Sequence, residues 1–314
     1  MILCCGEALI DMIPAPTDAG AEGFVPHSGG AVFNTAISLG RLGVPTGFLT
    51  GLSNDMFGEQ LAQDLARSNV DSRFAVRSDL PTTLAFVKLT DGHATYTFYD
   101  ENTAGRSLRP EQLSDIPAEV TALYFGGISL ISEPCADFYA ALAEREAPHR
   151  TIVLDPNIRP GFITDEARYR ARLARMIAVA DIVKVSDEDL DWIIGGDTDK
   201  DSKVAHLLGQ GPSIVVLTEG SAGASAWRAG KAPVTVPAKR ANVVDTVGAG
   251  DTFNAGVLAQ LYLDARLARA ELQTAQDTDL AVALQKGAAV AAITVARAGA
   301  NPPWAEELNT QVAG

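Results

Sequence analysis

The chain has 314 residues, of which 47% are apolar and 20% are charged, a composition typical of a globular protein with a substantial core. Its net charge of −14 is unfavourable for binding nucleic acid or an anionic membrane surface, because such binding requires clustered Lys and Arg. The three cysteines, Cys4, Cys5 and Cys135, have no metal-ligand spacing, and we expect buried thiols in a reducing cytoplasm. No charge-free apolar stretch reaches about 18 residues, so no membrane span is expected.

Strand-like and helix-like segments alternate along the chain, which predicts a parallel or mixed sheet covered by helices. The expected strands are 2–5, 8–13, 46–52, 123–125, 151–155, 181–185 and 213–218, followed by a hairpin of 224–228 and 232–236. The expected helices are 34–42, 57–68, 135–145, 165–178, 187–194, 252–262 and 279–296. Because neither an internal repeat nor a linker is evident, a single domain over residues 1–314 is expected.

Two segments do not follow this alternation. Residues 83–89 and 94–99 flank Asp91-Gly92, which is a strong hairpin signal. Residues 14–28 are rich in Pro and Gly and are expected to be irregular. Both segments would project from the main sheet and pair as a small lid, near residues 12–28 and 82–100. An exposed lid strand often serves as a dimer surface, so a homodimer through the lid is one open outcome.

The most specific motif of the chain is the string Asp-Thr-Val-Gly-Ala-Gly-Asp-Thr at residues 245–252. Gly248, Ala249 and Gly250 allow a ligand to approach the backbone closely, and the first amides of the helix that follows lack partners within it. Such a helix start favours a phosphate, and Asp251 beside it is well placed to accept a proton. The string indicates phosphoryl transfer to a hydroxyl, although a bare Gly-x-Gly-Asp would favour a tight turn with a helix cap.

The complete string resembles the second signature of the ribokinase-like, or PfkB, family of carbohydrate kinases. The resemblance implies that Asp251 is the catalytic base and that Gly248, Ala249 and Gly250 form the anion hole. It also implies an α/β fold of the ribokinase-like three-layer type, with a central, mostly parallel sheet and a small β lid. The implied cofactors are ATP and Mg²⁺, and a monovalent cation such as K⁺ near Asp245 is suggested by relatives.

Four residues near the N-terminus are candidates for binding a sugar. Asp11 lies at the end of the first strand region, where open α/β sheets bind ligands, and its carboxylate can accept hydrogen bonds from two hydroxyls. A solvated strand-end aspartate is equally consistent with this segment. Gly29, Gly30 and Asn34 lie in a stretch that resembles the first signature of the family, although Val32 departs from it. The alternative is a glycine turn with Asn34 as a helix cap.

Phe98 and Arg159 are two further candidates on the sugar side. Phe98 shares a strand face with Tyr96, and the family places an aromatic lid residue in this region, although ordinary strand packing is the alternative. The guanidinium of Arg159 has a planar fork that suits a phosphate or sugar oxygens. Its segment, 155–160, resembles that of fructokinases and 2-keto-3-deoxygluconate kinases, in which the Arg lies near the sugar and the transferred phosphate. A surface Arg in a Pro-bounded turn is equally compatible with the pattern.

Residues 184–189 stand where the family shows Asn-x-x-Glu, which is linked to the placement of Mg²⁺ and phosphate. Here Ser186 and Asp189 occupy the two positions and Glu188 is adjacent, so Asp189 or Glu188 would act on Mg²⁺ through water. The resemblance places Lys184 and Ser186 on the nucleotide side. A capping cluster at a helix start is the alternative interpretation.

The loop at 217–223 resembles the nucleotide-side loop of the family, with Thr218, Gly220 and Gly223 near the ATP phosphates. A strand-to-hairpin turn without a ligand is the alternative.

The reaction implied by these resemblances is ATP-dependent phosphorylation of a primary sugar hydroxyl. Segments 6–11, 81–86 and 155–160 are most similar to fructokinases, which implies conversion of D-fructose to fructose 6-phosphate. The alternatives are a kinase of ribose or nucleosides and a 2-keto-3-deoxygluconate kinase, whose acidic substrate would require an extra cation such as Arg106 or Lys88. A non-catalytic sugar or nucleotide sensor belongs to another class, and Asp251 argues against it because binding alone needs no base.

Overall fold

The computed structural model describes the backbone of residues 1–90 and 93–310 and the side chains of residues 1–87 and 96–308, so the predicted Asp91-Gly92 turn lies outside the described residues. A large central sheet contains β1 (Ile2–Cys5), β4 (Thr46–Leu49), β6 (Val70–Asp71), β10 (Ala122–Gly126), β11 (Thr151–Asp155), β12 (Ile182–Ser186), β13 (Ile214–Thr218), β14 (Ala224–Trp227) and β15 (Val234–Val236). Its nine strands have the order β15-β14-β13-β12-β11-β10-β1-β4-β6. Only β14 runs against the others, because it pairs antiparallel with both β13 and β15.

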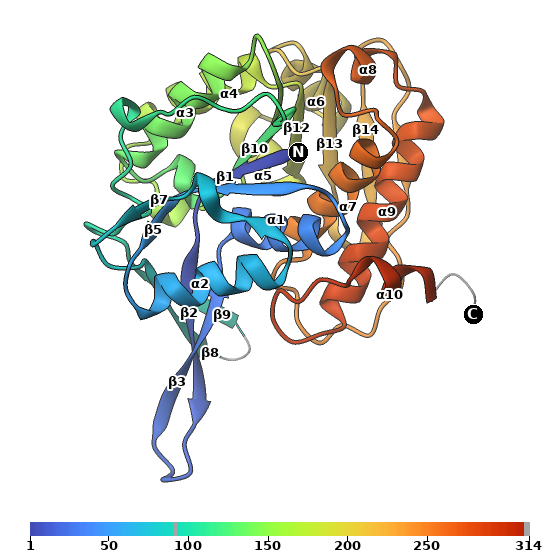
Figure 1. The fold of residues 1–314 in the computed structure, drawn as a ribbon. Coiled ribbons are helices and arrows are strands. Elements are labelled where there is room, and N and C mark those ends of the chain that lie inside the picture. Colours follow the sequence, from blue (N-terminus) through green and yellow to red (C-terminus); the bar gives the residue numbers. More distant parts are fainter. Residues whose placement is uncertain (91–92, 311–314) are drawn as a thin grey trace.

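Helices cover both faces of this sheet (Figure 1). One face is covered by α1 (Ala31–Arg41), α2 (Met56–Arg67), α7 (Ala249–Leu263), α8 (Arg269–Thr274) and α9 (Asp277–Val295), and the other by α3 (Cys135–Glu146), α4 (Glu166–Val179), α5 (Asp187–Ile194) and α6 (Lys200–Leu208). Successive strand residues belong to opposite cores: Cys4 packs on the first face and Cys5 on the second. Burial on both faces explains the continuous apolar runs of the strands and confirms the predicted fold class.

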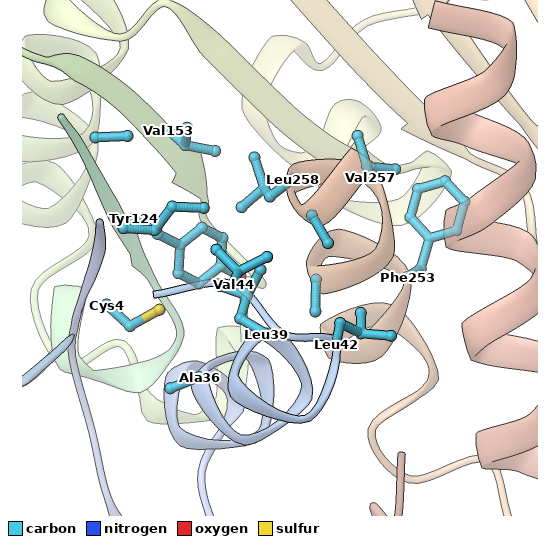
Figure 2. Close-up of a cluster of buried hydrophobic side chains, with 14 of the residues drawn as sticks. Cys4, Ala36, Leu39, Leu42, Val44, Tyr124, Val153, Phe253, Val257 and Leu258 are labelled. Carbon is cyan, nitrogen blue, oxygen red and sulfur yellow. The ribbon is translucent and has the colours of Figure 1, made fainter. Parts of the chain in front are cut away.

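The core beneath α1 and α7 holds these two helices against the sheet. Figure 2 shows side chains of α1, α7, β10 and β11 converging there; the labelled residues include Leu39, Leu42, Tyr124, Val153, Val257 and Leu258. On its other side α7 packs against α9, where Gly256 and Gly287 face each other. A Cβ added to Gly256 would lie 2.7 Å from the Cα of Gly287, so the two backbones are in direct contact. This contact fixes the position of α7.

A four-stranded sheet forms the lid and projects from the main body (Figure 1). It contains β2 (Leu9–Pro16), β3 (Glu22–Gly29), β8 (Leu84–Thr90) and β9 (His93–Tyr99), in the order β3-β2-β8-β9. The expectation of an irregular segment at 14–28 was wrong, because most of it forms an antiparallel hairpin of β2 and β3. Pro14 and Pro16 are tolerated because β8 pairs with β2 only at residues 10–12, and Pro26 lies on the edge strand β3.

Several smaller features differ from the expected elements. The strand expected at 46–52 is divided into β4 and β5 (Gly51–Ser53), and β5 pairs with β7 (Val76–Ser78). The helices α6, α8 and α10 (Ala305–Thr310) were not predicted. By length and composition α9 is apolar enough to cross a membrane, but it packs along α7 and against β14 and β15, as a core helix does.

We predict that Gly256→Ala lowers the free energy of unfolding by about 1–3 kcal/mol, because the new methyl group has no room against α9. The measurement is the midpoint of urea unfolding. Val282→Ala, at a 44% exposed position of α9, serves as the control and should change stability by at most about 0.5 kcal/mol. A stable Gly256→Ala variant would show that the two helices are free to separate.

Candidate active site

Two cavities meet at the N-terminus of α7. The smaller, of about 330 Å³, lies between the lid and the carboxyl ends of the central strands, and the larger, of about 630 Å³, lies between α7, α9 and the loop that precedes α7. Thr246, Ala249 and Gly250 line both cavities. A ligand group bound at the first turn of α7 would therefore be accessible from both cavities.

The first turn of α7 presents backbone amides to these cavities. Gly248 precedes the helix with a φ of +76°, and a Cβ there would lie 2.5 Å from the Cβ of Ala300. Within the described part of the chain, the amides of Gly250 and Asp251 donate no hydrogen bond. Unpaired amides at the positive end of a helix favour an anion, and these two lie within the stretch 248–251 for which the sequence predicts an anion hole.

Asp251 lies in the same turn, and its carboxylate lines the smaller cavity. The residue is 7% exposed, and its Oδ2 accepts a hydrogen bond from Asn34 Nδ2 at 2.9 Å. Burial raises the pKa of Asp251 to about 7, and the charges of Asp155 and Glu7 act in the same direction. The hydrogen bond from Asn34 and the charge of Lys184 oppose this increase. A carboxylate with these properties exchanges a proton readily near neutral pH.

The lid strands bring a second carboxylate to the smaller cavity. Asp11 lies on β2, and a Cβ on Gly29 would fall 2.1 Å from its Oδ2, so the absence of a side chain at Gly29 makes room for Asp11. Burial raises the pKa of Asp11 to about 6. Gly30 lines the cavity with a φ of +109°, and a Cβ there would lie 2.9 Å from the carbonyl oxygen of Glu7. The structure thus brings the three residues Asp11, Gly30 and Asn34 together in the lining of one cavity.

Aromatic residues close the outer side of the same cavity. Phe98 and Tyr96, both on β9, line it together with Phe162 from the 3₁₀ turn Pro160–Phe162. The rings of Phe98 and Phe162 meet edge to face with their centroids 4.5 Å apart. Phe162 was not predicted from the sequence, because its contact with the lid joins residues far apart in the chain.

Arg159 lines the same cavity as Asp11, and its guanidinium donates to the carbonyl oxygen of Ile158 at 3.0 Å. No ion pair to Arg159 is formed by the residues that the structure describes. The loop that carries it is held by Asp189, whose Oδ1 accepts from the amide of Ile158 at 2.8 Å and whose Oδ2 accepts from that of Ser186 at 3.1 Å. Arg159 is therefore available to a ligand.

The residues predicted to act on Mg²⁺ lie outside both cavities. Both carboxylate oxygens of Asp189 are bonded to backbone amides, and Ser186 caps α5. Glu188 is exposed on the first turn of that helix. Among the described side chains no group of three or more acidic, His or Cys residues is arranged to hold a metal ion. These residues fit Mg²⁺ only through intervening water.

The larger cavity is lined by four of the residues predicted to contact a nucleotide, whereas Lys184 and Gly248 line the smaller cavity and Ser186 lines neither. Thr218, Gly220 and Gly223 form one wall, and Ala288, Ala291, Ala292 and Val295 of α9 form an apolar wall opposite. Lys239 and Arg240, which were not singled out from the sequence, lie at its edge. A Cβ on Gly223 would lie 2.2 Å from the carbonyl oxygen of Val236, so this glycine is required by packing.

Two further acidic residues hold backbone around the cavities. Asp245 accepts hydrogen bonds from the amides of Val247 at 3.0 Å and Gly299 at 2.9 Å. Glu7, which was not predicted, accepts from the amide of Ala31 at 2.9 Å and from that of Ser129 at 3.2 Å. No local pattern identifies Glu7, because both of its partners come from distant segments.

Comparison with known proteins agrees with this geometry. The sequence matches the family described as "pfkB family carbohydrate kinase" over residues 1–307. A fructokinase from Rhizobium leguminosarum bv. trifolii is 54% identical over 280 residues, covering 89% of this chain and 85% of that protein.

Two solved structures have the same fold. The crystal structure of fructokinase with bound ATP from Xylella fastidiosa superposes with a TM-score of 0.89 at 29% identity, covering 100% of this chain and 99% of the other. Aminoimidazole riboside kinase from Salmonella enterica, complexed with aminoimidazole riboside and an ATP analogue, gives a TM-score of 0.83 at 25% identity, covering 100% and 99%. The protein belongs to the pfkB family of carbohydrate kinases.

Proposed function

We propose that the protein is an ATP-dependent fructokinase that converts D-fructose to fructose 6-phosphate. The observation that carries this proposal is the buried carboxylate of Asp251, which lies beside unpaired helix amides where two cavities meet. The identity of 54% to a fructokinase supports the choice of sugar.

In the proposed reaction Asp251 accepts the proton of the primary hydroxyl as that oxygen bonds to the γ-phosphorus of ATP. The bond from the γ-phosphorus to the β–γ bridging oxygen breaks, and ADP leaves with the electron pair. Asp11, Gly29, Gly30 and Asn34 would position the sugar, with Phe98 covering it. The amides of residues 248–251 and Arg159 would stabilise the charge of the transferring group, so that catalysis depends on positioning and electrostatics.

The larger cavity is proposed to hold ATP. Thr218, Gly220 and Gly223 would lie along the phosphates, with Gly248, Gly250 and Lys184 at the γ-phosphate. Ser186, which caps α5 and lines neither cavity, would act on the nucleotide only through water. Mg²⁺, when bound, neutralises phosphate charge, and most of its ligands would be phosphate oxygens and water. Asp189 and Glu188 would reach it only through water, and a K⁺ ion is proposed near Asp245.

At the level of the whole molecule, we propose a single kinase domain over residues 1–314 and a cytoplasmic location. The three cysteines are buried and unpaired, as expected in a reducing compartment. A homodimer through the lid is also proposed, since Phe24, Val25 and Tyr99 expose apolar surface there.

The residues around the smaller cavity favour a neutral sugar over 2-keto-3-deoxygluconate. Three acidic residues, Glu7, Asp11 and Asp251, line it together with two cations, Arg159 and Lys184. Arg106 does not supply a further cation, because its guanidinium is bonded to Asp100 and to the carbonyl of Glu133. The side chain of Lys88 lies outside the described residues. A riboside or ribose is the second candidate, because the fold is shared with a riboside kinase.

We predict the highest kcat/KM for D-fructose when ADP formation is followed with fructose, ribose, nucleosides and 2-keto-3-deoxygluconate. Wild-type chain with each sugar omitted measures background ATP hydrolysis. A preference for the keto acid or a riboside would refute the substrate. Binding of ATP and sugar with no ADP formation would instead indicate a sensor.

Asp251→Asn is expected to retain sugar binding and to lower kcat by about 10²–10⁴-fold, because the amide can still accept the Asn34 hydrogen bond but takes no proton. Calorimetric sugar binding and steady-state turnover measure the two effects. Asp264→Asn, at the exposed C-terminal end of the same helix, is the matched control and should turn over like the wild type. Equal turnover in both variants would exclude Asp251 as the base.

The pH dependence follows from the pKa of Asp251, which burial raises to about 7. Because the base acts unprotonated, kcat/KM is expected to rise with pH up to about 7 and to decrease about tenfold per pH unit below it. The measurement is kcat/KM for the sugar at constant ionic strength with saturating ATP. A constant value between about pH 5.5 and pH 8 would contradict a buried carboxylate base.

A further inference from the structure

A buried ion pair lies directly beneath the first turn of α7. Lys184 on β12 is 7% exposed and Asp155 at the end of β11 is 1% exposed, and Lys184 Nζ lies 3.2 Å from Asp155 Oδ2. The other carboxylate oxygen of Asp155 is buried and has no hydrogen-bond partner. Removing two charges from water costs free energy, and a protein with well-packed apolar residues in place of a buried ion pair is often equally or more stable. Stability alone therefore gives a weak reason for this pair.

The pair is connected to the helix that carries Asp251. Asn254, one turn further along α7, donates through Nδ2 to Asp155 Oδ2 at 2.6 Å and to the Tyr124 hydroxyl at 3.0 Å. Tyr124 lies on β10, so three adjacent strands contribute to the network. Asp155 is thus fixed by hydrogen bonds from both the sheet and α7.

Lys184 is the member of the pair that reaches the site. It lines the smaller cavity together with Gly250 and Asp251, and a Cβ built on Gly250 would lie 3.4 Å from its Nζ. Burial alone would lower the pKa of Lys184, but the nearby charges of Asp155 and Asp189 outweigh burial and hold it above its usual range. A protonated ammonium is therefore present at the anion site.

We propose that Asp155 is a positioning residue that holds the ammonium of Lys184 between the carboxylate of Asp251 and the place of the transferring phosphoryl group. The inference rests on the proposed kinase function. Lys184 then serves two purposes: it attracts the phosphoryl oxygens and it favours the ionised form of the base. Asp155 balances it, because an unpaired lysine would hold Asp251 ionised too strongly to accept a proton.

The electrostatic surroundings of Asp251 make this balance measurable. Lys184 lowers the pKa of Asp251 and Asp155 raises it. The other groups that face or line this place are Glu7, Asp11, Asn34, Tyr124 and Arg159, and all of them stay unchanged in the test. Removing Lys184 and removing Asp155 should therefore displace the pH profile in opposite directions.

The test compares Lys184→Met, Asp155→Asn and the double variant through the pH dependence of kcat/KM for the sugar. The acid limb is the part of the profile in which kcat/KM decreases as the pH is lowered. Lys184→Met is expected to move this limb to higher pH by roughly one unit, which lowers kcat/KM about tenfold at low pH. Asp155→Asn is expected to move it to lower pH. The double variant should return close to the wild-type limb. Both single variants should also lower kcat about tenfold or more, because the ammonium is lost or displaced.

A matched control is the pair Lys203–Asp191, in which a lysine that is 8% exposed bonds to Asp191 at 2.8 Å on α5 and α6, away from both cavities. Asp191→Asn breaks this Lys–Asp pair and should leave the pH profile in place. Thermal unfolding of each variant identifies the folded ones. If Asp155→Asn does not fold, the acid limb of the double variant must still lie below that of Lys184→Met.

Acid limbs that stay in place, or that move in the same direction in both single variants, would overturn the proposal. So would an equal displacement in Asp191→Asn. The absence of turnover by the wild type with any sugar would refute the proposed function instead. If the wild type shows the expected decrease of kcat/KM at low pH and the variants show it at the same pH, only the role of Asp155 and Lys184 would be refuted.

Discussion

The site depends on the burial of one carboxylate at the start of a helix. The positive end of α7 would normally favour the ionised form of an acidic side chain in its first turn. Here burial has the larger effect, and the Asp251 carboxylate accepts its hydrogen bond from Asn34 on another helix. Among the described residues, the amides of Gly250 and Asp251 in that turn donate no hydrogen bond, whereas that of Ala249 donates to the carbonyl oxygen of Thr246. One helical turn can thus offer an anion site and a proton acceptor side by side.

The position of this turn is set by long-range packing. On one side α7 packs against the sheet and α1 (Figure 2), and on the other its backbone contacts α9 where Gly256 meets Gly287. The parallel strands end at the same edge, which brings Asp155 and Lys184 beneath the helix although Lys184 and Gly250 are 66 positions apart in the sequence. The lid contributes Asp11 from the opposite direction. Small residues at the helix contact are therefore as necessary to the site as the charged ones.

The sequence was most informative where chemistry and conformation are encoded in the same short segment. The string at 245–252 contains the glycines, the helix start and Asp251, and the structure places all of them at the first turn of α7, beside the smaller cavity. Glu7 and Phe162 escaped prediction because their partners are distant in sequence. The hairpin at 14–28 was not predicted, because prolines usually indicate irregular structure. Here they lie where the strand has no partner on one side, and the sequence does not reveal that pairing. For Asp189, the resemblance and the acidic cluster suggested Mg²⁺ bound through water, with a helix cap as the alternative, and the structure shows its oxygens bonded to the amides of Ile158 and Ser186, the latter in such a cap.

The two cavities differ in charge in a way that suits a neutral sugar and an anionic nucleotide. The chain carries a net charge of −14, yet among the described residues that line the larger cavity none is acidic, and Lys239 and Arg240 lie at its edge. The smaller cavity is lined by the acidic residues Glu7, Asp11 and Asp251 and also by the cations Lys184 and Arg159. Its carboxylates can accept hydrogen bonds from hydroxyl groups, and its cations can attract an anionic group. The boundary between the two environments falls at the first turn of α7, because Thr246, Ala249 and Gly250 line both cavities.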